Sequence, residues 1–465
     1  MVMTGLRVGD ISELRSRFDG EVILPSDSQY DEVRVVWNAM IDRKPALIAR
    51  CRNSKDVSSA VAFARAKGLV IAVRGGGHNI AGSATCDDGL LIDLSLMKHV
   101  EVNADLRTAT VEPGCLLADF DAAAQPHGLA TPLGINSTTG VAGLTLGGGF
   151  GWLSRKYGLT IDSLRSADVV TASGAQLHAS ATENDDLFWA LRGGGGNFGI
   201  VTRFEFQLHP IGPDVLSGLV VYSFDEAKSV LTQYARFTES MPDELSVWMV
   251  TRQAPPLPFL PERFHGKEVI VLALCYAGSP MDGEKLIDPL RRFGTVIGEY
   301  VGVQPYIAWQ QAFDPLLTSG ARNYWKSLNF TRLSDGAIDT IVHYAGRLPS
   351  PQCEIFIATL GGCVSSMEPG STAYPSRDAR YVINVHGRWN DASEDEHGIA
   401  WSREFFEKSK PFASDGGYVN FLTADEADRI ASAYGINYDR LVNLKRKFDP
   451  DNVFQINQNI MPRLG

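Results

Sequence analysis

The residues best suited to chemistry stand in one short stretch, Arg74-Gly75-Gly76-Gly77-His78-Asn79, directly after the apolar run 69–73. Three consecutive glycines allow the backbone to approach a ligand closely and to adopt positive φ values. Successive N–H groups in such a turn form a concave site for anions. We therefore predict that this backbone holds a phosphate-bearing cofactor and that His78 touches or bonds it. Taken alone, the stretch is equally compatible with a tight glycine turn that carries a surface histidine.

Two more glycine clusters follow, at residues 131–151 and 193–199, and glycine provides 45 of the 465 residues. Because the glycines are clustered, we read them as sites where the backbone must come close to something, not as disorder. One cofactor with a long phosphate chain explains all three clusters, since each loop needs its backbone near the ligand. Alternatively, residues 147–151 form a flexible loop and residues 193–199 serve close packing of a helix on a strand.

A dinucleotide site of the Rossmann type is the obvious competitor, because Gly194-Gly195-Gly196-Asn197-Phe198-Gly199 satisfies GxGxxG. That fingerprint must follow a strand and open a helix, so that the pyrophosphate meets the helix N-terminus. Here the motif follows a predicted helix and opens a predicted strand, so we reject this reading. The sequence also lacks a GxxxxGK[ST] phosphate loop, an HExxH motif and any CxxC pair among its six cysteines. We therefore expect no metal and no disulfide framework.

The overall composition is that of an ordinary globular protein, with 44% hydrophobic and 21% charged residues. A net charge of -11 argues against nucleic acid or an anionic membrane as the main partner. Residues 1–15 lack the apolar core of a signal peptide, and no apolar run reaches the roughly 18 residues of a spanning helix. We expect a cytoplasmic protein with a small-molecule substrate, and the sequence leaves a homo-oligomer open.

The local composition changes near Pro210 and Pro213, after which the glycine clusters nearly vanish. Before that point, Phe204 and Phe206 alternate with polar residues, which indicates a half-buried strand at 200–208. After it, strands and helices suggest an antiparallel sheet covered by helices on one face, and hence an α+β fold. Strands are predicted at 69–73, 90–94, 108–111, 168–172, 176–180, 200–208, 215–224, 245–251, 268–276, 354–360 and 381–389. Helices are predicted after a Ser54 cap up to Gly68, at 116–125, at 185–191 after an Asn184 cap, and at 226–238, 283–293, 335–347, 393–408 and 439–448.

Within the strand predicted at 381–389, Asn384, His386 and Arg388 share one face and apolar residues share the other. If the apolar face packs on helices, the polar face points at a cofactor or at solvent, and both readings fit. His386 is a candidate base, because the ordinary pKa of histidine lies near working pH. The run Arg322-Asn-Tyr324-Trp325-Lys326 is a candidate for an aromatic-binding pocket, although aromatic runs more often belong to a core.

Several motifs together resemble the vanillyl-alcohol oxidase/p-cresol methylhydroxylase (PCMH) flavoproteins. Val73-Arg-Gly-Gly-Gly-His78-Asn-Ile-Ala-Gly is similar to their pyrophosphate loop. The stretch Thr139-Gly-Val-Ala-Gly-Leu-Thr-Leu-Gly-Gly-Gly-Phe-Gly, with Arg155-Lys-Tyr-Gly-Leu and Asp162, resembles a second flavin segment. Arg192-Gly-Gly-Gly-Gly-Asn-Phe-Gly-Ile-Val-Thr resembles a third. The run from Tyr438-Asp-Arg-Leu to Phe448-Asp-Pro-Asp-Asn-Val-Phe resembles the berberine bridge enzyme branch, and the bacterial 6-hydroxynicotine oxidase type is the most similar.

The resemblance implies FAD bound through an 8α-histidyl bond at His78. It implies a two-part PCMH-type FAD-binding domain at 1–212 (core about 41–211), to which a segment at 416–465 returns. It also implies a substrate-binding domain at 213–415, whose sheet covers the isoalloxazine. The cofactor-binding residues that it implies are Arg74, Gly75, Gly76, Gly77, His78, Asn79, Gly82, Asn136, Thr138, Thr139, Gly140, Gly143, Gly148, Gly149, Gly151, Tyr157, Gly158, Asp162, Gly199, Ile200, Val201, Tyr418 and Asn457.

The segment Tyr418-Val-Asn420-Phe is similar to a Tyr-x-Asn-Tyr segment that lies beside the flavin in the family. We nominate Tyr418 for proton handling or substrate orientation, and Asn420 for a hydrogen bond to flavin or substrate. The alternative for Tyr418 is a tyrosine packed into the fold.

Two departures from the family pattern are informative. Asn136 stands where berberine bridge enzymes carry a cysteine that makes a second flavin link, and Cys86 and Cys115 lie elsewhere in the sequence. The resemblance therefore implies a single covalent link. Phe150 stands directly after the triple glycine, where some plant members have a catalytic tyrosine. Phenylalanine cannot titrate, so that mechanism cannot be carried over.

The reaction implied is hydride transfer from a C–H bond of an alcohol, amine, sugar or secondary metabolite to the flavin, while a base takes the accompanying proton. Molecular oxygen is the expected acceptor, which makes the protein an oxidase. A dehydrogenase or oxidative cyclase that uses another acceptor is the alternative enzyme. A flavin-binding protein without turnover is the non-enzymatic alternative, and Phe150 gives it some standing.

Overall fold

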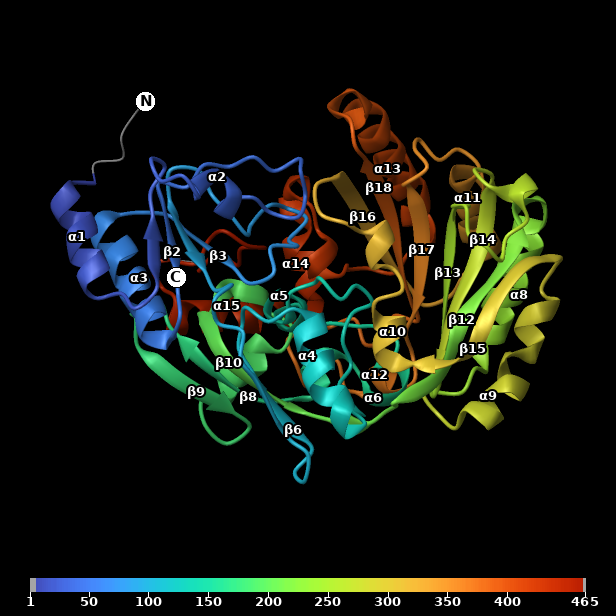
Figure 1. Cartoon of the computed structure of the whole chain (residues 1–465), viewed down its shortest axis with the longest axis horizontal. Helices are drawn as coiled ribbons and strands as arrows, with labels where there is room; N and C mark the ends of the chain where they lie inside the picture. Colours follow the sequence, from blue (N-terminus) through green and yellow to red (C-terminus); the bar gives the residue numbers. More distant parts are fainter. Residues whose placement is uncertain (1–5, 463–465) are drawn as a thin grey trace.

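The computed structural model describes residues 6–462 and builds them around four sheets. A seven-stranded sheet with its helices occupies one end of the long axis, and the four-stranded and five-stranded sheets occupy the other end (Figure 1). A small sheet pairs β7 (Leu129–Ala130) with β11 (His209–Pro210). Within the described residues, no helix is both long enough and apolar enough to cross a membrane.

The four-stranded sheet has the order β1-β2-β4-β3, in which β2, β4 and β3 run parallel and β1 is antiparallel to β2. Helix α3 links β2 to β3 and buries Val57, Val61 and Ala64, as predicted. The predicted Ser54 cap is wrong: Asn53 is the cap, because its side chain accepts the N–H of Asp56. The elements are α1 (Val8–Ser16), β1 (Glu21–Ile23), α2 (Tyr30–Val33), β2 (Leu47–Arg50), α3 (Ser54–Lys67), β3 (Ile71–Arg74) and β4 (Leu90–Asp93).

The five-stranded sheet is antiparallel, in the order β5-β6-β10-β8-β9. Phe204 and Phe206 of β10 are buried while their neighbours are not, which confirms the predicted half-buried strand. Asn184 occupies the predicted N-cap position of the helix at 185–191, but its side chain makes no capping hydrogen bond, because its φ is 47° and its amide donates to the carbonyl of His178. The elements are β5 (Val100–Asn103), β6 (Thr108–Val111), α4 (Leu117–Ala124), α5 (Val141–Leu146), α6 (Ser154–Tyr157), β8 (Leu164–Val170), β9 (Gln176–Ser180), α7 (Asp185–Leu191) and β10 (Ile200–Gln207).

The seven-stranded sheet is antiparallel throughout, in the order β15-β12-β14-β13-β17-β18-β16. Five of its strands match the predicted strands, whereas no strand was predicted for β15 or β16. The run 322–326 therefore belongs to an edge strand of this sheet. The strands are β12 (Asp214–Ser223), β13 (Leu245–Gln253), β14 (Glu268–Tyr276), β15 (Val296–Pro305), β16 (Arg322–Phe330), β17 (Glu354–Thr359) and β18 (Tyr381–Trp389).

Helices α8, α11 and α13 cover one face of this sheet, where Tyr234, Ile341 and Phe405 share a core with Ile357 and Ile383. This arrangement confirms the α+β class and the predicted sheet covered by helices. The helix predicted at 283–293 instead ends at residue 287, because Asp288-Pro289 begins a 3₁₀ turn. The helices are α8 (Ala227–Glu239), α9 (Pro280–Ile287), α10 (Tyr306–Gln310), α11 (Asp335–Ala345), α12 (Cys363–Ser366) and α13 (Asp395–Ser409).

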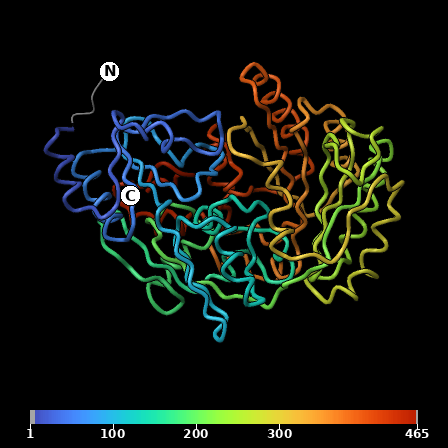
Figure 2. The backbone as a smooth tube through the Cα atoms, viewed as in Figure 1, coloured from blue at the N-terminus to red at the C-terminus, as the bar shows by residue number. Residues whose placement is uncertain are grey.

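The last segment of the chain returns to the first sheets, which Figure 2 shows as the red trace beside the blue one. It contains α14 (Ile430–Tyr434) and α15 (Tyr438–Phe448), and Phe454 shares a core with Ile71 and Leu90 of the four-stranded sheet. Asp451 pairs with Arg65 of α3 at 3.0 Å. The proposed boundaries after 212 and 415 are compatible with this path and remain a prediction.

Candidate functional site

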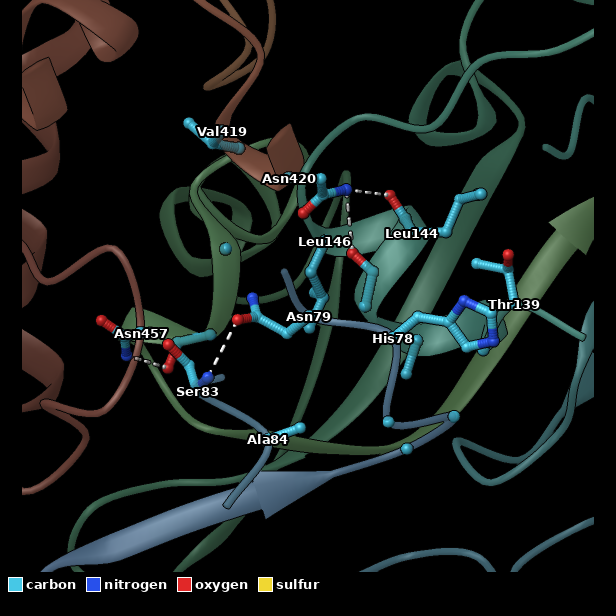
Figure 3. A pocket seen from close by; sticks show the side chains of 18 of the residues that line it. His78, Asn79, Ser83, Ala84, Thr139, Leu144, Leu146, Val419, Asn420 and Asn457 are labelled. Atoms are coloured by element: carbon cyan, nitrogen blue, oxygen red, sulfur yellow. Dashed lines mark hydrogen bonds between the residues drawn. The ribbon is translucent and has the colours of Figure 1, made fainter. Parts of the chain in front are cut away.

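A cavity of about 320 Å³ lies where the glycine clusters, the C-terminal segment and the face of the seven-stranded sheet opposite α8, α11 and α13 meet. Figure 3 shows His78, Thr139, Asn420 and Asn457 around it. A volume of this size suits a small-molecule or cofactor site. The predicted site residues that line it are Gly75, Gly76, Gly77, His78, Asn79, Asn136, Thr139, Gly140, Gly143, Gly199, Ile200, Val201, His386, Tyr418, Asn420 and Asn457.

The first two glycine clusters touch each other at the cavity wall. A Cβ added to Gly76 would lie 2.5 Å from the Gly140 backbone, and one added to Gly140 would lie 2.4 Å from the Gly76 nitrogen. Only glycine fits at either position. Among the described residues, no backbone carbonyl accepts the N–H groups of residues 75–79. This run of free donors is what the predicted anion-binding turn requires.

The third glycine cluster is fastened by the C-terminal segment. Asn457 donates to the carbonyl of Gly196 at 3.1 Å, and Asn197 accepts the N–H of Ile460 at 2.9 Å. The buried ammonium of Lys445 donates to the carbonyl of Asn197 at 3.0 Å. The chain end therefore closes one side of the cavity.

His78 stands at the end of the first glycine turn, with its ring stacked on Trp37 at 5.0 Å between centroids and 19° between planes. Its Nε2 lies 3.2 Å from Thr138 Oγ1. Burial lowers the pKa of His78 to about 4, which outweighs the opposite effect of a hydrogen bond with the Thr138 backbone. The imidazole is therefore neutral at neutral pH and carries a lone pair on one nitrogen.

Tyr418 is buried, and its hydroxyl accepts hydrogen bonds from the Gly149 N–H at 3.1 Å and from Asn420 at 2.9 Å. Burial raises the pKa of Tyr418 to about 12, although these two donors lower it. The hydroxyl therefore keeps its proton at neutral pH and has it available to donate. Phe150 packs against the Tyr418 ring at 4.8 Å.

The polar face of β18 is buried, so the solvated alternative for this face is wrong. His386 Nδ1 lies 3.3 Å from Glu354 Oε1, and its Nε2 lies 3.2 Å from Asn323 Oδ1. The orientation of the Asn323 amide is fixed, because its nitrogen donates to the Ala321 carbonyl and its oxygen also accepts from Arg388. Nε2 of His386 must therefore carry a hydrogen.

The charges around His386 keep a second proton away from its Nδ1. Burial lowers the pKa of His386, and the nearby Arg388 and Arg252 lower it further, against the raising effect of Glu354. Burial alone raises the pKa of Glu354, but His386, Arg252 and Arg388 bring it below its usual value. Arg252 pairs with Glu354 at 3.1 Å. At neutral pH, therefore, neither Nδ1 of His386 nor the facing carboxylate of Glu354 carries a proton, and one proton can be accepted between them. Both groups line the cavity.

The remaining predicted cofactor residues do not line the cavity, and the two charged ones among them have partners of opposite sign. Arg74 pairs with buried Asp93 at 2.8 Å. Asp162 pairs with buried Arg377 at 2.7 Å. These ion pairs brace the loops and leave no net charge to offer a ligand. The residues in this group are Arg74, Gly82, Thr138, Gly148, Gly149, Gly151, Tyr157, Gly158 and Asp162.

The uncharged members of this group pack against neighbouring residues, some of which line the cavity. Thr138 contacts His78, and Gly149 contacts Tyr418. A Cβ on Gly151 would lie 1.9 Å from the carbonyl oxygen of Leu133, and Tyr157 stacks on His209 at 4.0 Å. Gly148, which has a φ of 126°, has Tyr374 and Tyr418 beside it, while Gly82 abuts Ile41 and Gly158 abuts Asp162.

Several cavity residues were not predicted from the sequence, notably Glu354, Trp37 and Phe421. Glu354 did carry a signal, because it is the charged residue that opens an otherwise apolar strand. Phe421 also carried a signal, because it ends the segment Tyr418-Val-Asn420-Phe, whereas Trp37 carried none, since an isolated aromatic residue reads as core. Trp325 of the run 322–326 does line the cavity, 4.6 Å from the His386 ring, whereas Tyr324 belongs to the helix-covered core.

Comparison with known proteins finds relatives that cover nearly the whole chain. Residues 45–180 match the model of an FAD binding domain, and residues 417–461 match the model named berberine and berberine like. An FAD-linked oxidoreductase of Dictyostelium discoideum is 32% identical over 97% of each chain. The solved 6-hydroxy-D-nicotine oxidase of Arthrobacter nicotinovorans superposes with a TM-score of 0.86 at 29% identity, covering 96% of this chain and 98% of its own.

A third relative shares the fold at lower identity. Glucooligosaccharide oxidase of Acremonium strictum, described with a 6-S-cysteinyl, 8α-N1-histidyl FAD, superposes with a TM-score of 0.86 at 24% identity, covering 98% of this chain and 100% of its own. The chain therefore belongs to the FAD-linked oxidoreductases of the vanillyl-alcohol oxidase/p-cresol methylhydroxylase superfamily, in the berberine bridge enzyme-like branch, and it is an enzyme with FAD as its cofactor.

Proposed function

We propose that this enzyme is an oxidase that removes a hydride from a C–H bond of a small organic substrate and passes the electrons to molecular oxygen. We further propose that FAD is bound covalently through His78 alone. The observation that carries the proposal is a cavity with a neutral histidine, His78, on one wall and the proton-deficient pair His386–Glu354 on another. Oxidase relatives support the choice of acceptor.

The cavity residues fit FAD. Gly76 and Gly140 let the first two glycine clusters touch where any side chain would hold them apart, and both residues line the cavity. The free N–H groups of residues 75–79 suit the pyrophosphate. Two buried polar atoms on the cavity wall, Asn457 Oδ1 and Trp325 Nε1, have no hydrogen-bond partner among the described residues, and a bound ligand would supply one. When bound, FAD supplies a two-electron acceptor at this site.

A single link at His78 is supported by the residues that flank it. Glucooligosaccharide oxidase, by its description, carries both a cysteinyl and a histidyl link. In this chain Asn136 stands at the position that the resemblance assigns to the cysteine, and it lines the cavity. Neither Cys86 nor Cys115 lines the cavity, and burial raises the pKa of Cys86 to about 11 and that of Cys115 to about 12, so both stay protonated thiols.

We assign proton acceptance to His386 together with Glu354. The substrate must lose an O–H or N–H proton as its C–H bond breaks. The vacant position between Nδ1 of His386 and the carboxylate of Glu354 receives that proton, and the new N–H then bonds to the carboxylate. Arg252 and Arg388 keep the position empty beforehand by lowering the pKa of both groups.

We assign substrate orientation to Tyr418 and Asn420. Because the Tyr418 oxygen already accepts two hydrogen bonds, its own hydrogen is left to donate to an oxygen or nitrogen of the substrate. Asn420 also donates to the carbonyls of Gly143 and Leu144, which fixes the C-terminal segment to the second glycine cluster. The aromatic rings of Trp325, Phe356 and Phe421 complete the wall and favour a flat, partly apolar substrate.

The proposal is tested by two measurements on the purified protein. After acid precipitation, yellow colour that stays with the protein supports the covalent link, whereas a colourless pellet contradicts it. Oxygen consumption is then followed over a panel of aromatic alcohols, amines and sugars. Turnover only with an artificial acceptor would favour a dehydrogenase or oxidative cyclase, and no reduction of the bound flavin by any compound would favour a binding protein.

A further inference from the structure

The loop that carries Asn136 also reaches His78, through the hydroxyl group of Thr138. Thr138 Oγ1 lies 2.7 Å from Asn136 Oδ1 and 3.2 Å from His78 Nε2. Asn136 Oδ1 also accepts the Thr138 N–H at 3.0 Å, so the amide oxygen faces Thr138. The Thr138 hydroxyl hydrogen is therefore donated to Asn136, and the hydroxyl oxygen is left to accept a hydrogen from Nε2.

We propose that Thr138 and Asn136 are positioning residues for flavin attachment: they hold His78 in the tautomer with hydrogen on Nε2, which leaves the lone pair of Nδ1 to form the bond. This inference rests on the proposed function, since it requires a link at His78. A neutral imidazole carries one hydrogen, and the hydrogen bond made by one nitrogen decides the role of the other. We call the hydrogen-bonded series Asn136–Thr138–His78 the relay. Without the relay both tautomers would be populated, and part of the protein would present a protonated Nδ1 to the flavin.

The surrounding structure keeps this relay in place. The N–H of Ser137 donates to Asp314 at 2.9 Å, and the Ser137 hydroxyl donates to the same carboxylate at 2.5 Å. The carbonyl of Thr139 accepts the N–H of Leu117 at 2.9 Å. On the other side, the ring of Trp37 sets the plane of the imidazole. Both ends of the relay are thus fixed before a ligand arrives.

The attachment step balances with oxygen as oxidant. One C–N bond forms between Nδ1 and the 8α carbon of the flavin. One C–H bond of the 8α methyl group breaks, and the imidazole loses its N–H hydrogen. The two protons and two electrons released reduce dioxygen to hydrogen peroxide. Because burial lowers the pKa of His78 to about 4, the lone pair that the step needs is present at neutral pH.

Asn136 thereby gains a role of its own. The position that the family resemblance assigns to a second, cysteinyl link is occupied by a residue that supports the first link. A cysteine there would offer no amide oxygen to fix the Thr138 hydroxyl. The Asn136→Cys variant therefore weakens the relay whether or not it forms a new bond.

The kinetic test uses the full-length chain, produced without flavin in a riboflavin-starved host and then mixed with FAD in air. Acid-stable flavin is measured against time. Thr138→Val, which removes the hydroxyl from an exposed side chain, should slow attachment about tenfold, the effect of one lost hydrogen bond. Thr138→Ser should restore the rate. Asn136→Ala should be slow, because the Thr138 hydroxyl can then turn and donate to Nε2, whereas Asn136→Asp keeps an acceptor and should remain fast.

A spectroscopic test separates positioning from a general loss of structure. In the flavin-free chain with ¹⁵N-labelled histidine, the Nδ1 and Nε2 shifts of His78 report its tautomer. The wild-type chain and Thr138→Ser should show hydrogen on Nε2, and Thr138→Val should show a mixture. Asn136→Asp adds a nearby negative charge, so the acid limb of its attachment rate should move to higher pH.

The outcomes distinguish this inference from the proposed function. If wild-type flavin is released by acid, the His78 link itself is wrong. If wild-type flavin is acid-stable but Thr138→Val and Asn136→Ala attach it at the wild-type rate with an unchanged His78 spectrum, the relay is wrong and the link stands. Slow attachment in Thr138→Val that Thr138→Ser does not rescue also contradicts the relay.

Discussion

Trp37 lies flat against His78, with ring centroids 5.0 Å apart, although β2, α3 and β3 lie between the two residues in the sequence. The indole is held from its edge by a hydrogen bond to the carbonyl of Leu317, and the guanidinium of Arg388 lies over it, 5.3 Å from the ring centroid. The orientation of the histidine therefore depends on side chains from both ends of the molecule.

Replacing Trp37 tests this dependence. Trp37→Ala removes a stacked pair of the kind that contributes about 0.5–1.5 kcal/mol, so acid-stable flavin should form about two to ten times more slowly. Trp37→Phe keeps a flat ring and should attach flavin at nearly the wild-type rate. The measurement is the attachment time course used for Thr138. Equal rates in all three proteins would show that the stack does not orient His78.

The proton-accepting pair predicts the effect of two substitutions on flavin reduction. His386→Gln removes the base, and Glu354→Gln fills the vacant position with amide hydrogens, so each should slow anaerobic reduction of the flavin by about a hundredfold or more. Stopped-flow absorbance measures this step without involving oxygen. Glu268→Gln, on β14 of the same sheet, is the matched control and should leave the rate unchanged. A wild-type rate in Glu354→Gln would remove Glu354 from the mechanism.

The pH profile of the same step should reflect the lowered pKa of His386. Protonation of His386 fills the accepting position, so the rate falls as pH falls through its folded pKa. Burial and the two arginines lower that pKa. The acid limb of the rate should therefore lie below pH 6.5, the ordinary pKa of histidine. Arg388→Met removes a lowering charge and should move the limb to higher pH. Glu354→Gln removes a raising charge and should move any residual limb the other way.

Asp121 predicts a pH dependence of stability away from the chemistry. It is buried between α4 and α10, where Gln310 donates to it at 3.1 Å, and burial raises its pKa to about 7 from 3.8. The folded state therefore binds a proton that the unfolded state has lost between these values. Stability from this source is full below pH 4 and declines as pH rises through 7, by an amount on the order of 4 kcal/mol.

The substitution Asp121→Asn isolates that contribution. It should raise the melting temperature at pH 8 relative to the wild type and reduce the change in melting temperature between pH 5 and pH 8. Asp105→Asn, at an exposed position, is the control and should alter neither. If the wild type and Asp121→Asn show the same dependence on pH, the carboxyl group is ionised in the folded protein and the explanation fails.

Much of the fold followed from local sequence patterns. The alternation of Phe204 and Phe206 located β10, and helical spacing of Val57, Val61 and Ala64 located α3. Strands β15 and β16 were missed because their residues do not separate cleanly into apolar and polar faces. Strand β15 is a partly exposed edge strand. Strand β16 buries the polar residues Asn323, Ser327 and Asn329 on the face opposite its helix-covered residues. Pairing with β12 and β18 decides their conformation, and such pairing is not a local property.

The site residues also fall into those that local patterns revealed and those that they did not. Glycine clusters reveal where backbone must be bare, so the walls at residues 75–79 and at Gly140, Gly143 and Gly199 were found. The charged residues Arg74 and Asp162 were assigned to the cofactor by resemblance, but each has an ion-pair partner on another element: Asp93 on the neighbouring strand β4, and Arg377, 215 residues along the chain from Asp162. The pairing of His386 with Glu354 depends on the register between β17 and β18, which no single-strand pattern contains.

The cavity is enclosed by stretches that begin near residue 37 and end near residue 458, so nearly the whole fold must be in place before it exists. A ligand that fills it binds the folded state alone, and mass action then makes thermal stability rise with free ligand concentration. A covalent tether breaks that dependence, because dilution no longer removes the ligand. Heat stability that is insensitive to added FAD in the holoprotein, but sensitive to it in His78→Ala, would therefore be the thermodynamic signature of the tether.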